Sequence, residues 1–194
     1  DEANKKYENS GNVNGNNYNW GYDPHNYFTP EGWYATDAAD PYCRIRELRE
    51  LINECHKAGI GVLLDVVYNH MAGTQFLDDI VPGYYFRTNA KGGFTSNSGC
   101  GNDTATERTM MKRLVVDSTS HWVKNYKVDG FRFDLMGLME ASSVVDSYKA
   151  CKKINASTLF EGEGWRMYNG APGTVGMDQR YMLQTNEVSV FNDE

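Results

Sequence analysis

An arginine and an aspartate stand two residues apart among large apolar side chains in the segment VDGFRFDLMG (residues 128–137). Side chains alternate across a β-strand, so Arg132 and Asp134 would share one face of a strand here. The opposite face would carry Phe131, Phe133 and Leu135. A guanidinium beside a buried carboxylate lowers the pKa of that carboxylate and keeps it ionised, which a nucleophilic carboxylate requires. For an isolated Arg-x-Asp pair, a structural ion pair is the simpler interpretation.

Two other apolar runs also end in carboxylates. IGVLLDVV (residues 60–67) contains Asp65 and is followed by His70, and STLFEGE (residues 157–163) contains Glu161 and Glu163. The two glutamates are two residues apart and share a face, so alternation does not distinguish between them.

The elements that must position these residues alternate along the chain. Helices are expected over residues 40–59, 104–126 and 140–153, and each is followed by one of the three apolar runs. Asp40 suits the N-cap of the first helix, and Thr104 to Glu107 fits a capping box for the second. Alternating helices and strands indicate an α/β fold with a parallel sheet, in which residues 60–67 would be buried on both faces. Ligands bind beyond the carboxyl ends of such strands, where all three runs deliver carboxylates.

Two segments between these elements are expected to be loops. Residues 1–19 contain seven Asn and two Gly, and residues 71–103 are polar and rich in Gly. A loop as long as the second is usually functional in a compact domain.

Charge and cysteine content limit the class of protein. The chain has 194 residues, a net charge of −7 and no cluster of several Lys or Arg, which argues against a nucleic-acid or anionic-membrane partner. No apolar stretch reaches the roughly 18 residues of a membrane span. The four cysteines are widely spaced with no nearby His cluster, so no zinc site is expected. They favour a reduced, cytoplasmic setting, while an extracellular one stays open, and we expect a monomer.

Three segments resemble, in order and spacing, the first three signature regions of the α-amylase superfamily of glycoside hydrolases. They are DVVYNH (residues 65–70), GFRFDL (residues 130–135) and GEGW (residues 162–165). YNWGYDP (residues 18–24) is similar in all seven positions to a motif of type I pullulanases, and GCGNDTATER (residues 99–108) fits the same subgroup. The resemblance implies retaining hydrolysis of α-1,6-glucosidic links in pullulan, amylopectin or limit dextrins, with an α-glucan as partner and no required cofactor.

By position, the resemblance implies that Asp134 is the nucleophile, Glu163 the general acid/base and Arg132 the group that orients Asp134. Residues implied to bind the substrate are Tyr22, Asp65, His70, Asn102 and Trp165. A retaining glycosidase needs two carboxylates about 5 Å apart, which the ends of neighbouring strands supply. Asn69 lies where many relatives hold a structural calcium ion, and the resemblance leaves calcium open here.

The resemblance also implies that residues 1–194 form part of a catalytic (β/α)8 TIM barrel, incomplete at both ends. They would cover roughly the end of barrel strand 2 to strand 6, and the third catalytic carboxylate would lie beyond Glu194. The chain alone is therefore expected to be inactive and poorly folded, with sheet edges exposed. Alternatives are another amylase-superfamily enzyme, such as an amylopullulanase or isoamylase, a non-catalytic glucan-binding relative, or a carboxylate-bridged metal hydrolase.

Overall fold

The computed structural model describes residues 20–32 and 34–191. The loop expected for residues 1–19, which includes Tyr18 and Asn19 of the YNWGYDP motif, lies outside the described residues. The described part is an α/β structure built on one parallel sheet with the strand order β1-β2-β3-β4. The strands are β1 (Leu63–Val66), β2 (Gly130–Phe133), β3 (Leu159–Gly162) and β4 (Ser189–Val190). The apolar runs predicted the first three, and β4 extends the sheet beyond β3.

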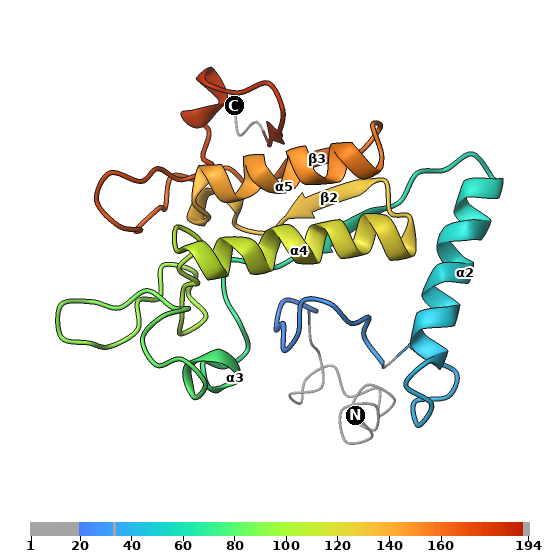
Figure 1. Ribbon diagram of the computed structural model, residues 1–194, viewed down its shortest axis with the longest axis horizontal. Helices are drawn as coiled ribbons and strands as arrows, with labels where there is room; N and C mark the ends of the chain where they lie inside the picture. Colours follow the sequence, from blue (N-terminus) through green and yellow to red (C-terminus); the bar gives the residue numbers. More distant parts are fainter. Residues whose placement is uncertain (1–19, 33, 192–194) are drawn as a thin grey trace.

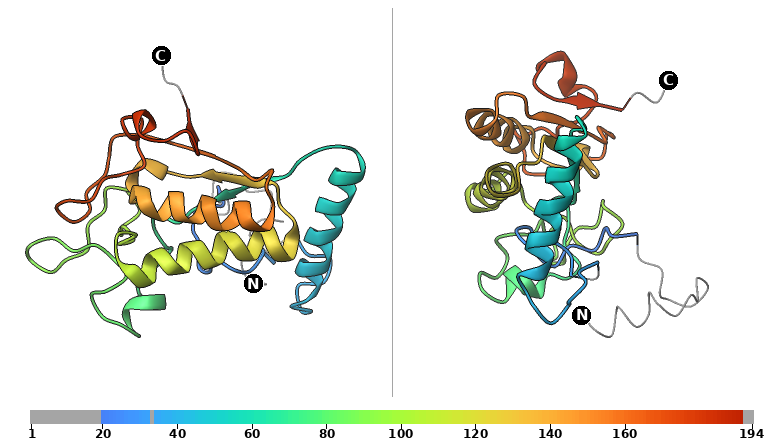
Figure 2. Two further views of the ribbon diagram at one scale, coloured as in Figure 1. Left: turned by 45° about the horizontal axis from the view of Figure 1, so that its top comes forward. Right: turned by 90° about the vertical axis from the view of Figure 1, so that its right-hand side faces the viewer.

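The helices are α2 (Cys43–Lys57), α3 (Gln75–Asp78), α4 (Thr109–Tyr126) and α5 (Ala141–Ile154), with short 3-10 turns η1 (Met136–Leu138) and η2 (Tyr181–Leu183). Figures 1 and 2 show that α4 and α5 lie side by side and cover one face of the sheet. The loops that follow β1, β2 and β3 gather at one end of the molecule, beyond the carboxyl ends of the strands (Figure 1).

The face of the sheet beneath α4 and α5 is aromatic. Phe131 and Phe133 of β2 are fully buried, and the ring centroids of both lie 5.1 to 5.3 Å from that of Phe160 in β3. Tyr148 of α5 packs edge-on against Phe160. Because the apolar side chains of β2 pack against the helices, Arg132 between them faces the other side, as alternation predicts.

Leu135 departs from that prediction. Strand β2 ends at Phe133, and Leu135 adopts a left-handed backbone conformation with φ 41° and ψ 45°. It therefore does not continue the apolar face of the strand.

Two predicted helix starts are wrong. Helix α2 begins at Cys43 rather than just after Asp40, although the Asp40 carboxylate still accepts the Tyr42 N–H at 2.9 Å. The predicted capping box does not form, because the Thr104 hydroxyl donates to the Tyr68 carbonyl and Glu107 pairs with Arg87. Tertiary partners thus take up both side chains, and α4 begins only at Thr109.

The prediction that residues 60–67 are buried on both faces holds only for the last two residues of the run. Val66 and Val67 are buried, whereas Ile60 and Leu63 are exposed. Ile60 precedes β1, which is an edge strand in the described sheet, so the beginning of the run has a neighbouring strand on one side only.

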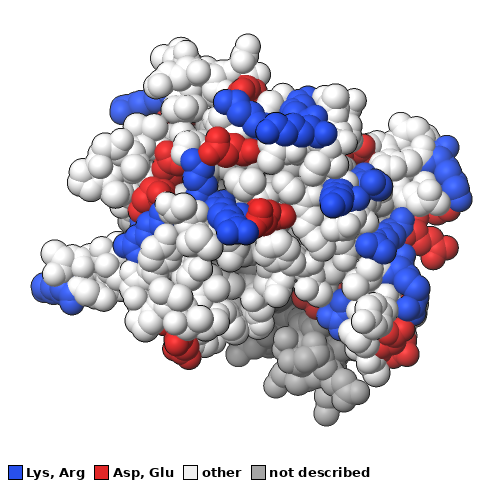
Figure 3. All heavy atoms as spheres, viewed as in Figure 1, with Lys and Arg blue, Asp and Glu red and all other residues white. Residues whose placement is uncertain are grey.

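Charges of both signs lie on the surface of the described residues. On the face shown in Figure 3, positive and negative side chains are interspersed. Cys43, Cys55, Cys100 and Cys151 are free thiols. Among the helices of the described residues, none combines the length and apolar character needed to cross a bilayer.

Candidate active site

Charged side chains from three neighbouring strands converge at the carboxyl ends of those strands. Asp65 of β1 and Glu161 of β3 are both in register with Arg132 of β2. Asp134 lies two residues after Arg132, and Glu163 lies two residues after Glu161. Both therefore lie on the same face as Arg132. The sheet thus brings together side chains that are up to 98 positions apart in the sequence, from Asp65 to Glu163.

The Arg132 guanidinium is the centre of this group. Its Nη1 donates to Asp65 Oδ1 at 2.9 Å and to Asp134 Oδ1 at 3.4 Å, while its Nη2 lies 2.7 Å from Glu163 Oε1. The side chain is mostly buried. Three carboxylates without a cation would repel one another in such a place, so Arg132 allows them to share one site. Glu163, the glutamate that the resemblance implied as the general acid/base, forms this ion pair.

The Asp134 carboxylate has a raised pKa, in contrast to the expected lowering by Arg132. Burial is the largest cause, and the negative charge of Glu163 adds to it. A hydrogen bond from Asn69 and the positive charges of Arg132 and His70 lower the pKa but do not offset burial. The expectation was therefore right about the influence of Arg132 and wrong about the net direction, because it left out the cost of desolvation.

The Glu163 side chain is held by the turn that follows β2. Its Oε2 accepts the Leu135 backbone N–H at 2.9 Å, and its backbone carbonyl accepts the Gly137 N–H at 2.8 Å. The left-handed conformation of Leu135, which costs a non-glycine residue about 1 kcal/mol or more, aims this N–H at the carboxylate. Strained backbone of this kind is typical of functional sites, and the sequence contains no signal for it.

Gly137 allows the turn to pack closely on the segment after β3. A Cβ atom at this position would lie 1.8 Å from the Trp165 carbonyl oxygen. This explains the glycine that closes the segment VDGFRFDLMG.

Substitution Gly137→Ala is therefore expected to push residues 163–165 away from the turn. We expect a loss of about 1–3 kcal/mol in the free energy of unfolding and a lower turnover rate, because Glu163 moves with that segment. Urea unfolding and steady-state kinetics would measure both. Gly61→Ala is the matched control, since its Cβ would come no closer than 3.5 Å to Asp129. Equal effects of the two substitutions would contradict the prediction.

Tyr22 joins the charged group directly. Its hydroxyl donates to Asp65 Oδ2 at 2.9 Å, and its ring centroid lies 5.9 Å from Arg132 Cζ. The hydrogen bond with Asp65 is the main cause of the raised pKa of this tyrosine. The YNWGYDP motif thus supplies an aromatic ring beside the carboxylates.

Two of the residues implied to bind substrate, His70 and Asn102, are buried. His70 is buried, with Nδ1 2.6 Å from Asn69 Oδ1 and Nε2 2.8 Å from the Tyr22 carbonyl oxygen. Asn102 is also buried, and its amide pairs with the backbone N–H and carbonyl of Met71. Their polar atoms therefore hold neighbouring segments in place.

Trp165 lies in the loop beyond β3, two residues after Glu163, and is partly buried. Its backbone carbonyl accepts the Met167 N–H at 3.0 Å. The loop thus places this indole close to Glu163 along the chain.

Both polar atoms of the Asn69 side chain have partners within the protein. Its Oδ1 faces His70 Nδ1, and its Nδ2 donates to Asp134. Within residues 20–32 and 34–191, no group of three or more His, Cys, Asp or Glu side chains is arranged to hold a metal ion.

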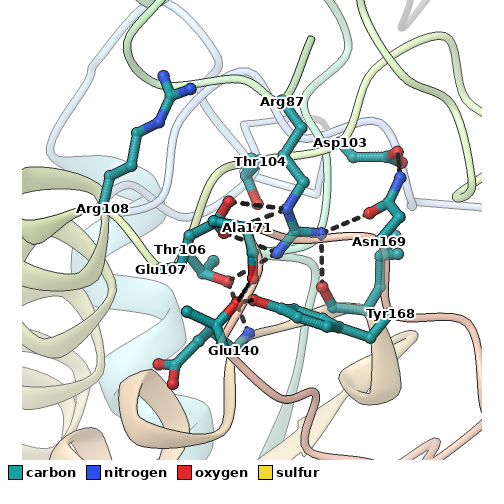
Figure 4. A network of polar contacts seen from close by, with 12 residues as sticks. Arg87, Asp103, Thr104, Thr106, Glu107, Arg108, Glu140, Tyr168, Asn169 and Ala171 are labelled. Atoms are coloured by element: carbon teal, nitrogen blue, oxygen red, sulfur yellow. Dashed lines mark hydrogen bonds and ion pairs between the residues drawn. The ribbon is translucent and has the colours of Figure 1, made fainter. Parts of the chain in front are cut away.

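A buried ion pair that sequence reasoning missed supports the loops around the site (Figure 4). Arg87, which is 4% exposed, donates from Nε and Nη2 to Glu107 Oε2 at 3.1 and 2.9 Å. Its Nη1 donates to the Leu138 carbonyl at 2.9 Å and to Asn169 Oδ1 at 2.8 Å, and its guanidinium lies over the Tyr168 ring. One side chain thus joins the loops that follow β1, β2 and β3.

The chain is similar in sequence to several pullulanases. No family model matches it. It is 47% identical over 180 residues to Pullulanase A of Streptococcus pneumoniae serotype 2, a match that covers 92% of this chain and 14% of that protein. It is 40% identical over 157 residues to Pullulanase of Bacillus subtilis, covering 80% and 22% of the two chains. The chain spans less than a quarter of the length of these relatives.

Solved pullulanase structures have the same fold over most of the chain. The Group B Streptococcus pullulanase SAP, solved in complex with maltotetraose, superposes with a TM-score of 0.87 at 45% identity, covering 92% of this chain and 23% of that one. Pullulanase type I from Bacillus subtilis, solved with maltose, gives a TM-score of 0.86 at 37% identity, covering 91% and 25%.

Proposed function

Because this chain belongs to the type I pullulanase family of glycoside hydrolases, we propose that the protein containing it cleaves α-1,6-glucosidic links in pullulan, amylopectin or limit dextrins. The observation that supports this most is the placement of Asp134 and Glu163 on the two terminal nitrogens of the Arg132 guanidinium, at the carboxyl ends of neighbouring strands. We propose that the reaction needs no cofactor.

The reaction proposed is a retaining double displacement. The Asp134 carboxylate attacks the anomeric carbon while Glu163 gives its proton to the departing glycosidic oxygen, which leaves a glucosyl ester on Asp134. Glu163 then takes a proton from water, the water oxygen bonds to the anomeric carbon, and the ester bond breaks. Arg132 keeps the two carboxylates in one place throughout.

The substrate contacts follow from the positions of the aromatic and polar side chains. We propose that the Tyr22 ring and Trp165 pack against sugar rings and that Asp65 accepts hydrogen bonds from sugar hydroxyls. His70 and Asn102 would act indirectly, because their side chains hold Asn69 and Met71 in place.

The chain is proposed to be one part of a larger catalytic domain. In this proposal residues 1–194 cover roughly the end of strand 2 to strand 6 of a (β/α)8 barrel, with β1 to β4 as strands 3 to 6. Other parts of the same protein supply the remaining strands and the third catalytic carboxylate. We also propose a monomer. The four free thiols favour a reducing, cytoplasmic setting, and an extracellular or cell-surface setting stays open.

Analysis of the products released by the full-length protein tests the activity. Release of maltotriose from pullulan is expected, since cleavage of every α-1,6 link gives that product. Debranching of amylopectin without release of maltotriose would instead favour an isoamylase. Cleavage of linear amylose alone, or binding of glucan without hydrolysis, would overturn the proposal.

A further inference from the structure

The side chain of Asn69 contacts both the carboxylate and the backbone of Asp134, the proposed nucleophile. The Asn69 Nδ2 donates to Asp134 Oδ2 at 2.8 Å and to the Asp134 backbone carbonyl at 2.9 Å. Asn69 is 1% exposed and follows β1, whereas Asp134 follows β2. The Asn69 amide therefore ties the Asp134 carboxylate to the segment that follows β1.

The orientation of this amide is determined by its neighbours. The two Asp134 atoms that face this amide, the backbone carbonyl oxygen and Oδ2, are both acceptors. The Asn69 nitrogen must therefore point toward them. The oxygen then faces His70 Nδ1 at 2.6 Å, and that nitrogen donates to it. Because His70 Nε2 contacts the Tyr22 carbonyl, the imidazole ring cannot turn without losing a second contact.

The two oxygens of Asp134 have different donors. Arg132 donates to Oδ1 over a long 3.4 Å, whereas Asn69 donates to Oδ2 at 2.8 Å. A contact of 3.4 Å is weak and would leave the carboxylate free to rotate. The Asn69 hydrogen bond is therefore the stronger constraint on the plane of the attacking group.

We infer that Asn69 is a positioning residue that orients the Asp134 carboxylate for attack, with its own amide fixed by His70. The inference rests on the proposed role of Asp134 as nucleophile. It also gives both polar atoms of the amide a partner, since the oxygen accepts from His70 Nδ1.

The test compares variants Asn69→Ala and Asn69→Asp in the full-length enzyme with pullulan as substrate. Loss of a hydrogen bond to a charged group is expected to lower kcat about 10- to 100-fold in Asn69→Ala with little change in KM. Asn69→Asp should lose more, because it sets two carboxylates side by side, and added CaCl2 should not restore it. Asn155→Asp is the control: Asn155 accepts the Ser157 N–H at the far end of α5, and an aspartate there still accepts.

A substrate with a fluoride leaving group, which departs without a proton, separates positioning of the nucleophile from other effects. With an α-glucosyl fluoride, Glu163→Gln should regain the first step, formation of the glucosyl enzyme, seen as a burst of released fluoride, whereas Asn69→Ala should regain none of its loss in that step. Wild-type kcat in Asn69→Asp, or its activation by calcium, would overturn the inference.

A stability measurement keeps the test independent of activity. Asn69→Asp is expected to lower the Tm of the enzyme, and addition of Asp134→Asn should restore it, since the new amide donates to the new carboxylate. An equal loss in both backgrounds would show that the two side chains are not coupled. If wild-type enzyme fails to cleave pullulan, the proposed function fails, while this measurement still decides whether Asn69 orients residue 134.

Discussion

Asp134→Asn is expected to lower the rate of α-glucan hydrolysis by the full-length enzyme by about 10⁴-fold or more. The amide has nearly the same shape as the carboxylate but does not form a glucosyl ester, so no covalent intermediate accumulates. Steady-state kinetics on pullulan and trapping of the glucosyl enzyme, detected by its intact mass, would measure both effects. Substrate binding should persist, because Tyr22 and Asp65 are unchanged.

The same substitution is expected to stabilise the fold at neutral pH. The pKa of Asp134 in the folded protein lies above its ordinary value near 3.8, chiefly because of burial. The folded state thus binds the proton more tightly than the unfolded chain. This tighter proton binding at Asp134 contributes fully to stability below the pKa of the unfolded state. The contribution is lost as the pH rises through the pKa of the folded state. Asp134→Asn should therefore be more stable than wild type at pH 7 and lose this advantage near pH 3.

Three further variants make the result specific. Asp117→Asn changes an exposed carboxylate on α4 and should leave both activity and stability close to wild type. Glu163→Gln should also abolish turnover of pullulan, whereas Glu161→Gln should retain far more activity if Glu163 is the acid. Unchanged hydrolysis in Asp134→Asn would rule out Asp134 as the nucleophile, and a loss of stability at pH 7 would contradict the raised pKa.

The sequence was sufficient to predict those parts of the site that depend on local periodicity. Alternation placed Arg132 opposite Phe131 and Phe133, and the order of helices and runs predicted three of the four parallel strands found in the described residues. The meeting of Asp65, Asp134 and Glu163 followed, because parallel strands end at the same edge of a sheet.

What the sequence did not reveal depends on partners that are distant along the chain. Arg87 meets Asn169 across 82 positions, and Glu107 pairs with Arg87 instead of capping the helix that follows it. The raised pKa of Asp134 likewise depends on how deeply the folded chain buries it. No local pattern encodes either the burial or these pairings, so only the structure shows them.

Arg87→Met is expected to destabilise the protein by about 3–5 kcal/mol, because it leaves the Glu107 carboxylate buried without its cation. Glu107 is 7% exposed, so water cannot readily replace the lost guanidinium. The Leu138 carbonyl and Asn169 also lose a donor, which frees the turn that presents the Leu135 N–H to Glu163. Urea unfolding of the full-length enzyme and its turnover of pullulan should therefore both decline.

The double variant Arg87→Met/Glu107→Met separates the buried charge from the lost contacts. Removal of both charges should recover most of the stability, since a buried ion pair is often replaced by apolar side chains at little cost. Turnover should recover less, because no donor returns to the Leu138 carbonyl. Arg113→Met removes one half of the exposed Arg113–Asp117 pair on α4 and should change stability by less than about 1 kcal/mol. If Arg87→Met were as mild as Arg113→Met, the buried pair would not be what holds the three loops together.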